Sequence, residues 1–184
     1  MEITFETATT DQHFQQILQL QQQNLYSRLS TEQQGEQGFV FAEHTLDLLK
    51  TMASHLPQVI ALHQDQVIGY SLAMTAGMKY ILPSLIPMFE QFERMDYKGK
   101  PLSAYRFMVG GQVCVHPLFR GKGLLEKLYQ QSRDRLPAGY ELCVTEISTR
   151  NPKSLRAHEK MGFELSGSYQ DTKELWNVVV WAFK

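Results

Sequence analysis

The chain has 184 residues, of which 43% are hydrophobic, and its formal net charge is −1. This length and apolar content suffice for a sizeable core, so we expect a single domain over residues 1–184. A nearly neutral chain without a long basic run favours neither nucleic acid nor a membrane surface as a partner. Its start lacks a basic region followed by an apolar run, and no apolar stretch is long enough for a transmembrane helix. We therefore expect a soluble, cytoplasmic protein.

The cysteines and histidines give no indication of a metal centre. Cys114 and Cys143 lie in apolar runs and lack C-x-x-C spacing, which favours reduced core cysteines over a disulfide or a zinc site. The six histidines do not form an H-E-x-x-H motif. We therefore expect no metal cofactor.

The first part of the chain shows alternating strand and helix patterns. Residues 2–7 alternate apolar and polar side chains, which predicts a strand, and Asp11 can cap the helix that follows. The many glutamines of this helix are assigned to its solvated face. Polar residues 27–38 predict a loop, after which Thr45 can cap a second helix. The apolar positions expected to pack are Phe14, Ile17, Leu18 and Leu25 in the first helix and Leu46, Leu49, Met52, Ala53 and Leu56 in the second.

Two β-branched runs, residues 58–63 and 67–74, predict a hairpin around residues 64–66. Residues 76–100 are the least regular span, because several prolines interrupt them. Apolar spacing within this span still predicts one short helix with an apolar face. The span is either a lid or a packed connection, and the pattern leaves both interpretations open.

The second part predicts a strand, a helix and a parallel strand. Residues 103–115 suit a strand, and Pro117 prevents the ladder from continuing. Gly110-Gly111 indicates a bulge or a close approach by another backbone or a ligand. A helix over 121–136 and a strand over 140–147 complete a βαβ unit with parallel pairing. Two final strands are expected over residues 163–169 and 174–183.

The turn between the first strand and helix of this unit is suited to an anion. Arg120–Gly123 supplies two cations and two glycines, and free N–H groups at a helix start, with the macrodipole, attract negative charge. A nucleotide-triphosphatase loop would need Ser or Thr where Gly123 follows Lys122. A dinucleotide-binding fingerprint would need glycine or alanine where Glu126 stands. A basic surface turn without a ligand is the remaining alternative.

Two motifs in this region resemble those of the GNAT superfamily of N-acetyltransferases. The acyl-CoA-binding pattern V-x-V-x-P followed by Arg/Gln-x-x-Gly-x-Gly/Ala is met over Val113–Leu125, except that Leu125 replaces glycine or alanine. The pattern N-x-x-Ala/Ser-x-x-x-Tyr-x-K-x-G-F is met over Asn151–Phe163, except that His158 replaces tyrosine. Capping rules alone also predict a short helix here, with Asn151 as its cap and Gly162 at its end.

The resemblance implies an α/β fold with a central twisted, mostly antiparallel sheet of about seven strands, a parallel splayed pair and flanking helices. It also implies acetyl-CoA as the co-substrate. Backbone groups around Cys114, from Val113 to Val115, would pair with the pantetheine arm, which Asn151 would contact by its side chain. The pyrophosphate would lie on the N–H groups of Gly121, Lys122, Gly123, Leu124 and Leu125. Arg120, Lys122 and Lys127 suit phosphate neutralisation, although a solvated surface face is the usual explanation of charge on a helix.

The implied chemistry is direct transfer of an acetyl group to a primary amine. An alkylammonium, with a pKa of about 10, must lose a proton before it attacks, and the departing CoA thiolate benefits from gaining one. Glu146 is the carboxylate inside the apolar run 142–147, where burial would raise its pKa towards that of a working base. His158 stands where the family usually has its acid and is the predicted proton donor. The alternatives are a solvent-facing Glu146, a packed His158 and an Asn151 that only caps.

We expect a small-molecule amine as the acceptor, recognised by residues 27–41 and 76–100, because loops on a rigid sheet commonly carry specificity. Two alternatives stay open: transfer to a protein amine, and an acyl-CoA-binding module without turnover. The oligomeric state is open too, with a homodimer allowed.

Overall fold

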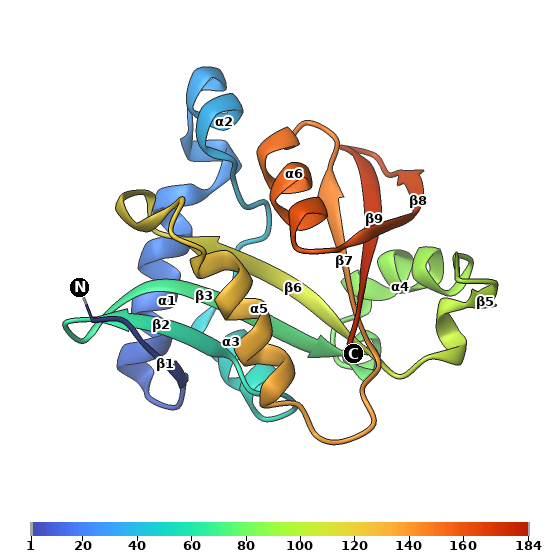
Figure 1. Ribbon diagram of the computed structural model, residues 1–184, viewed down its shortest axis with the longest axis horizontal. Coiled ribbons are helices and arrows are strands. Elements are labelled where there is room, and N and C mark those ends of the chain that lie inside the picture. The colour runs from blue at the N-terminus through green and yellow to red at the C-terminus, as the bar shows by residue number, and fades with distance from the viewer. Residues whose placement is uncertain (1, 184) are drawn as a thin grey trace. The chain divides into compact units, whose positions relative to one another are not determined.

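The computed structural model describes residues 2–183, which contain a seven-stranded mixed sheet in the order β1-β2-β3-β6-β7-β9-β8 (Figure 1). Strands β6 and β7 pair in parallel through Phe107–Val109 and Leu142–Val144. The pairs β1–β2, β2–β3, β7–β9 and β8–β9 are antiparallel. The predicted α/β class, strand number and parallel pair are confirmed, whereas the splaying of that pair stays a prediction.

The chain divides into two compact units, each built from two separate stretches. The first unit runs up to Ala73 and resumes over Gly110–Leu136, and the second takes Met74–Val109 and the residues from Pro137 onward. The expectation of a single domain stays a prediction.

The first unit combines three antiparallel strands, three capped helices and the end of a fourth strand with the helix that follows it. Its elements are β1 (Thr4–Thr7), α1 (Asp11–Asn24), α2 (Thr31–Gln37), α3 (Leu46–Ala53), β2 (Val59–His63), β3 (Gln66–Thr75) as far as Ala73, the latter part of β6 (Phe107–Val115) and α5 (Leu124–Asp134).

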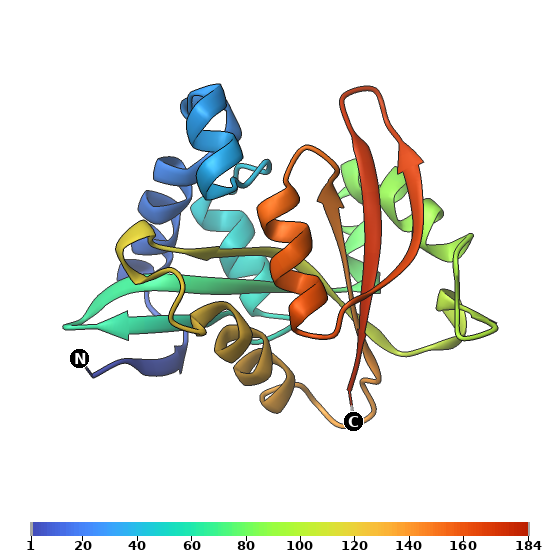
Figure 2. The same ribbon diagram turned by 45° about the horizontal axis from the view of Figure 1, so that its top comes forward.

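Helices cover both faces of the strands in this unit. Helix α5 places Leu124 and Leu128 against Val59 and Ala61 of β2 and Ile68 of β3, while α1 and α3 lie on the opposite face (Figures 1 and 2). Residues from Val67 to Ala73 are accordingly buried at consecutive positions rather than at alternate ones. An uninterrupted apolar run is what a strand covered on both faces requires.

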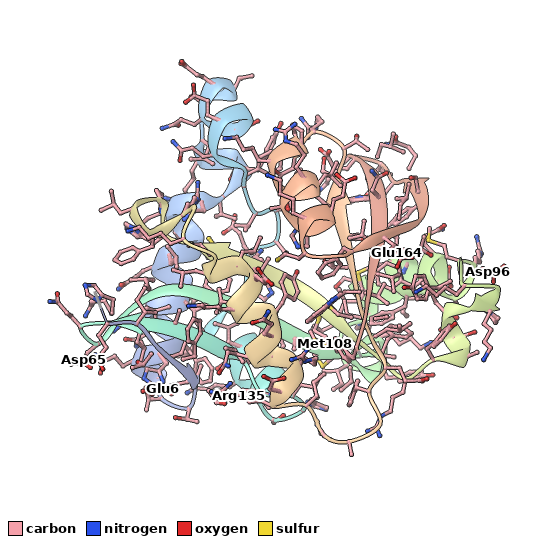
Figure 3. All side chains as sticks on the ribbon, viewed as in Figure 1. Glu6, Asp65, Asp96, Met108, Arg135 and Glu164 are labelled. Atoms are coloured by element: carbon pink, nitrogen blue, oxygen red, sulfur yellow. The ribbon has the colours of Figure 1, made fainter. Side chains whose placement is uncertain are left out.

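The β2–β3 hairpin turns without a glycine. Gln64 and Asp65 adopt φ values of 50° and 60°, the left-handed conformation that the favoured two-residue hairpin turns need. Asp65 lies at the tip of the hairpin (Figure 3). The side chain of Gln16 from α1 accepts a hydrogen bond from the Val67 backbone at 2.7 Å and donates to the Asp65 carbonyl at 3.3 Å. The predicted hairpin is confirmed, and a glutamine of α1 braces its turn.

Three local predictions in this unit were wrong. Residues 31–37 form helix α2 rather than a loop, and the signal was present as a capping box in which Ser30 and Gln33 exchange hydrogen bonds. Thr10, not Asp11, caps α1. Gln21 does not face solvent, because it is fully buried and donates to the side chain of Gln112 at 2.7 Å.

The second unit carries the carboxyl-terminal strands and their helices. Its elements are the last residues of β3, α4 (Ile86–Glu93), the short hairpin of β4 (Asp96–Tyr97) and β5 (Lys100–Pro101), the first part of β6, β7 (Leu142–Ser148), α6 (Pro152–Lys160), β8 (Glu164–Gln170) and β9 (Leu175–Ala182). The predicted helices and strands are present within a few residues of their expected bounds, but the β4–β5 hairpin was not foreseen.

Helices α4 and α6 lie on opposite faces of the β7–β9–β8 part of the sheet (Figure 2). The buried Phe89 and Phe92 form the predicted apolar face of α4. On the other face, Phe163 at the end of α6 stacks on Trp181 of β9, with ring centroids 5.8 Å apart. The β7 strand between them is therefore covered on both sides.

Gln58 provides the first testable prediction. It is fully buried, accepts from the Ala73 backbone at 2.9 Å and donates to the carbonyls of Leu56 and Ala73 at 2.7 and 3.0 Å. Gln58→Leu would leave these buried backbone groups without partners, so we expect a loss of about 2 kcal/mol or more of unfolding free energy in urea. The exposed Gln66→Leu in the same hairpin serves as the control and should change stability by about 0.5 kcal/mol or less. Equal effects of the two substitutions would contradict this role of Gln58.

Candidate active site

The turn after β6 depends on two left-handed glycines. Gly121 and Gly123 both have φ of 74°, and a Cβ at either would meet no atom within 4 Å. The backbone conformation, not a lack of space, therefore requires glycine here. Gly121, Lys122 and Gly123 are exposed, so this backbone lies open to a ligand.

Helix α5 begins without a capping side chain. Gly123 is its N-cap residue and offers none. Helix α4 also begins without one, whereas side chains of Thr10, Ser30, Thr45 and Asn151 cap α1, α2, α3 and α6. The first-turn N–H groups of a helix have no partners within the helix. With the macrodipole behind them, they suit an anion, as the sequence predicted.

The two leucines at the start of α5 pack this helix against the core of the first unit. Leu124 is buried in the core, and Leu125 packs against the same cluster of apolar side chains. Leucine at position 125, where the motif usually has a smaller residue, is thus accommodated by packing. Its backbone N–H still belongs to the first turn of the helix.

Arg120 fixes the turn from its side. Its Nε donates to the Val115 carbonyl at 2.9 Å, Nη1 to the Gln37 carbonyl at 2.8 Å and Nη2 to the Asn24 Oδ1 at 2.5 Å. The guanidinium therefore clamps the turn to the ends of α1 and α2, a role that the sequence did not reveal. Its charge still lies beside the turn, and its contact with phosphate stays a prediction.

The remaining predicted contacts in this unit differ in orientation. Val113 and Val115 pack on the α5 face of the sheet. Cys114 is buried beside Tyr70, and burial raises the pKa of its thiol to about 12. A neutral buried thiol is no nucleophile, so Cys114 can contribute to a ligand site only through its backbone.

Cys114 and Cys143 are both free and buried, as predicted. Lys122 is exposed, with its Nζ 5.2 Å from the Phe119 ring centroid.

In the second unit, Glu146 lies half-buried in β7. Burial raises the pKa of its carboxyl to about 7, and the negative charge of Asp171 contributes in the same direction. The hydroxyl of Tyr169 donates to Oε2 of Glu146, which partly offsets the increase because it stabilises the carboxylate. A carboxyl with this pKa exchanges a proton near neutral pH, as a general base must.

Asn151 caps α6, as predicted from the sequence. Its Oδ1 accepts a hydrogen bond from the Ser154 backbone at 3.3 Å, and the side chain is only 5% exposed. Pro152 occupies the first turn of the helix, and Gly162 follows its end with φ of 92°. The contact of Asn151 with a pantetheine arm stays a prediction.

His158 is buried in α6 and uncharged near neutral pH. Its Nδ1 lies 2.8 Å from the Ser154 carbonyl, which only accepts, so the neutral ring carries its proton on Nδ1. Burial lowers the pKa of His158 to about 4, and its ring meets Phe163 edge-on with centroids 5.0 Å apart. His158 is therefore buried and packed against Phe163, as the alternative interpretation of this residue held. Its role as a proton donor stays a prediction.

The strand register separates the two candidate catalytic groups. In the β7–β9 ladder, Glu146 pairs with Val178 and Cys143 pairs with Trp181. Trp181 stacks on Phe163, whose ring contacts His158, so His158 lies on the face of Trp181. Positions an odd number of residues apart point to opposite faces of a sheet. Glu146 and His158 therefore lie on opposite faces of the β7–β9–β8 segment.

Two residues around Glu146 were missed from the sequence. Tyr169 belongs to β8, and Asp171 organises the loop to β9 by accepting from the backbones of Lys173 and Glu174 at 2.7 and 2.6 Å and from Trp176 Nε1 at 2.8 Å. The aspartate between two predicted strands was a signal for this turn. Nothing in the sequence indicated that Tyr169 would meet Glu146, since that contact depends on the register of three strands.

Over the described residues 2–183, no helix is both long and apolar enough to cross a membrane. Within the same range, no three His, Cys, Asp or Glu residues are grouped so that they could hold a metal ion.

The family model described as Acetyltransferase (GNAT) family matches residues 14–163, and the chain belongs to this family. It is therefore an acyltransferase by family, as the two motifs predicted.

Individual proteins resemble this chain over part of the sequence or in fold. The L-methionine sulfoximine/L-methionine sulfone acetyltransferase of Salmonella typhimurium is 32% identical over 68 residues, which are 36% of this chain and 40% of that protein's length. The structure of Arabidopsis thaliana NAA60 in complex with acetyl-CoA has a TM-score of 0.66 at 12% identity, covering 99% of this chain and 100% of that one. The NatC complex bound to Gag peptide and CoA has a TM-score of 0.65 at 16% identity, covering 100% of both chains.

Proposed function

We propose that this protein transfers the acetyl group of acetyl-CoA directly to a primary amine of a small molecule. The observation that carries the proposal is Glu146, a half-buried carboxyl whose pKa is raised to about 7 in a chain of the acetyltransferase family. A carboxyl with this pKa is mostly ionised at slightly alkaline pH. It can take a proton from an ammonium group and release that proton to solvent before the next turnover.

The co-substrate is assigned to the turn that opens α5. The two left-handed glycines expose the backbone, and the uncapped N–H groups of Gly123 to Leu125 would face the pyrophosphate. The complex of Arabidopsis thaliana NAA60 with acetyl-CoA supports this choice of co-substrate. The backbone from Val113 to Val115 and the side chain of Asn151 are assigned to the pantetheine arm.

In the proposed reaction, Glu146 accepts a proton from the acceptor's ammonium group. The freed nitrogen lone pair attacks the thioester carbonyl carbon, a C–N bond forms as the C–S bond breaks, and the now positively charged nitrogen loses its second proton to solvent. The sulfur leaves with the electron pair and gains a proton, which we assign to His158. Because the pKa of His158 is about 4, its charged form is scarce near neutral pH, and donation would draw on a ring that is charged only transiently.

Two similar proteins point to different acceptor amines. The Salmonella relative supports a small amino-acid-like amine, while the peptide in the NatC complex supports a terminal amine of a polypeptide. Thiol release should be compared for L-methionine sulfone, L-methionine sulfoximine and a short peptide with a free amino terminus. Turnover with the first two and not the third supports the proposal. The reverse favours protein acetylation, and no thiol release from any amine favours a binding module.

The glycine turn gives the second prediction. Gly123→Asp places an anion and a strained backbone where the pyrophosphate would lie, so we expect CoA affinity to fall about tenfold or more in calorimetry. Gly99→Asp is a matched control, because Gly99 has φ of 77° and an equally open surrounding but lies in the β4–β5 hairpin. If Gly123→Asp binds CoA as tightly as Gly99→Asp does, pyrophosphate does not lie on this turn.

The third prediction concerns Glu146. Glu146→Gln keeps the shape of the side chain but removes the base, and turnover should fall about 10³-fold while CoA affinity is kept. In the wild type, kcat/KM should rise with pH through about 7, because the carboxyl becomes ionised in that range. Glu159→Gln, on the exposed side of α6, is the control. A fully active Glu146→Gln variant would eliminate this base.

The fourth prediction tests His158. His158→Ala should lower turnover about 10²-fold with little change in CoA affinity, whereas the exposed His55→Ala should leave both unchanged. Because the pKa of His158 is about 4, the wild-type rate should show no step near pH 6.5, where an ordinary histidine titrates. Near wild-type turnover in His158→Ala, with chemistry shown to limit the rate, would assign protonation of the thiolate to water or another group.

A further inference from the structure

Tyr169 meets Glu146 because of the register of three strands. Glu146 of β7 pairs with Val178 of β9, which in turn pairs with Gly167 of β8. Tyr169 follows Gly167 by two residues and so projects from the same face as Glu146. Its hydroxyl donates to Oε2 of Glu146. The contact is thus built by residues 23 positions apart whose strands do not adjoin.

The hydroxyl of Tyr169 is a dependable donor. Tyr169 is partly buried, and both burial and the neighbouring charge of Glu146 raise the pKa of its phenol well above the usual value. The phenol therefore stays protonated throughout the range in which Glu146 titrates. A neutral hydroxyl that donates to a carboxylate stabilises the ionised form and fixes the oxygen that it contacts.

We propose that Tyr169 is a positioning residue for the base, holding Oε2 of Glu146 so that Oε1 is the oxygen that receives the proton of the acceptor amine. This inference rests on the proposed function of Glu146 as the base. Oriented in this way, the carboxylate has one oxygen in a fixed hydrogen bond and one for chemistry. A base with a single fixed orientation loses less conformational freedom when the amine arrives.

Several charged or titratable groups neighbour this carboxylate in the described residues. Asp171, in the loop after β8, raises the pKa of both Glu146 and Tyr169. Further along the same strand, Ser148 donates to Glu174 at 2.6 Å, and Glu174 is neutralised by an ion pair with Arg150. His158 lies across the sheet and stays neutral. Tyr169 and Asp171 thus act on Glu146 in opposite directions.

This opposition gives a sharp experiment on the full chain. The protein is labelled with [¹³C]glutamate, and the carboxyl resonance of Glu146 is identified by its loss in Glu146→Gln. Tyr169→Phe removes the donor and should move the titration of Glu146 to higher pH by about one unit, since a hydrogen bond to the charged form is lost. Asp171→Asn removes a negative charge and should move the titration of Glu146 to lower pH. The exposed Tyr80→Phe is the control and should leave it unchanged.

Turnover is then measured with L-methionine sulfone and with the short peptide, over the same pH range. The rise of kcat/KM with pH should shift with the Glu146 resonance in Tyr169→Phe, and kcat should fall about tenfold near pH 7 where the wild-type carboxylate is already populated. A Tyr169 that only packs would move neither the resonance nor the profile.

The outcomes separate the two proposals. If Glu146→Gln is inactive but Tyr169→Phe shifts neither titration nor rate, the positioning role is wrong and the base assignment stands. If Glu146→Gln is active, the base assignment fails whatever the resonance does. If Tyr169→Phe unfolds, the wild-type chain is labelled with 3-fluorotyrosine instead, which keeps the ring and makes its hydroxyl a stronger donor: the titration of Glu146 should move to lower pH, and an unmoved titration would contradict the positioning role.

Discussion

The clamp that Arg120 places on the β6–α5 turn is the constraint on which the first unit's candidate site depends. Gly121 and Gly123, the two left-handed residues of this turn, leave its backbone exposed, and an exposed glycine loop has much conformational freedom to lose. The three hydrogen bonds from one guanidinium to Val115, Gln37 and Asn24 hold this loop to two other segments. A preorganised turn binds an anion without first having to be ordered. The same bonds make the ends of α1 and α2 part of the support for the turn.

In the second unit the corresponding constraint is the register of β7, β9 and β8. Moving any strand by one residue would turn its side chains to the other face, so the Glu146–Tyr169 contact exists in one register only. Burying a carboxylate is costly unless it is hydrogen-bonded. Here burial raises the pKa of Glu146, the hydrogen bond from Tyr169 partly offsets that increase, and the charge of Asp171 adds to it. The carboxyl is consequently balanced near pH 7 instead of being permanently ionised or permanently protonated.

Local chemistry made much of this structure predictable, and distance in sequence set the limit. Caps such as Thr45 and Asn151, the end of β6 at Pro117 and the left-handed Gly162 follow from a few neighbouring residues. Helix α2 was not predicted, because the polar composition of residues 27–38 was taken to indicate a loop. The capping box of Ser30 and Gln33 was the sequence signal for this helix. The burial of Gln21 and the clamp formed by Arg120 could not be predicted, since a polar side chain is buried only where distant segments supply its partners. The raised pKa of Glu146 was foreseen from its apolar neighbours, but the tyrosine that tunes it was not.

Of the two proton transfers in the proposed reaction, only the first is obligatory. The two candidate groups differ accordingly in how well their pKa values suit proton transfer. An ammonium with a pKa of about 10 has no lone pair and cannot attack at all, so removing its proton is obligatory. A thiol with a pKa of about 8.5 is a tolerable leaving group as its anion, so protonating it helps but is not essential. Burial, together with Tyr169 of β8 and Asp171 of the loop after it, brings the pKa of Glu146 near neutrality, where a base works best. His158, with a pKa of about 4, is far from that optimum and lies on the opposite face of its strands. The larger share of the proton-transfer contribution to the rate should accordingly come from Glu146 and the side chains that hold it.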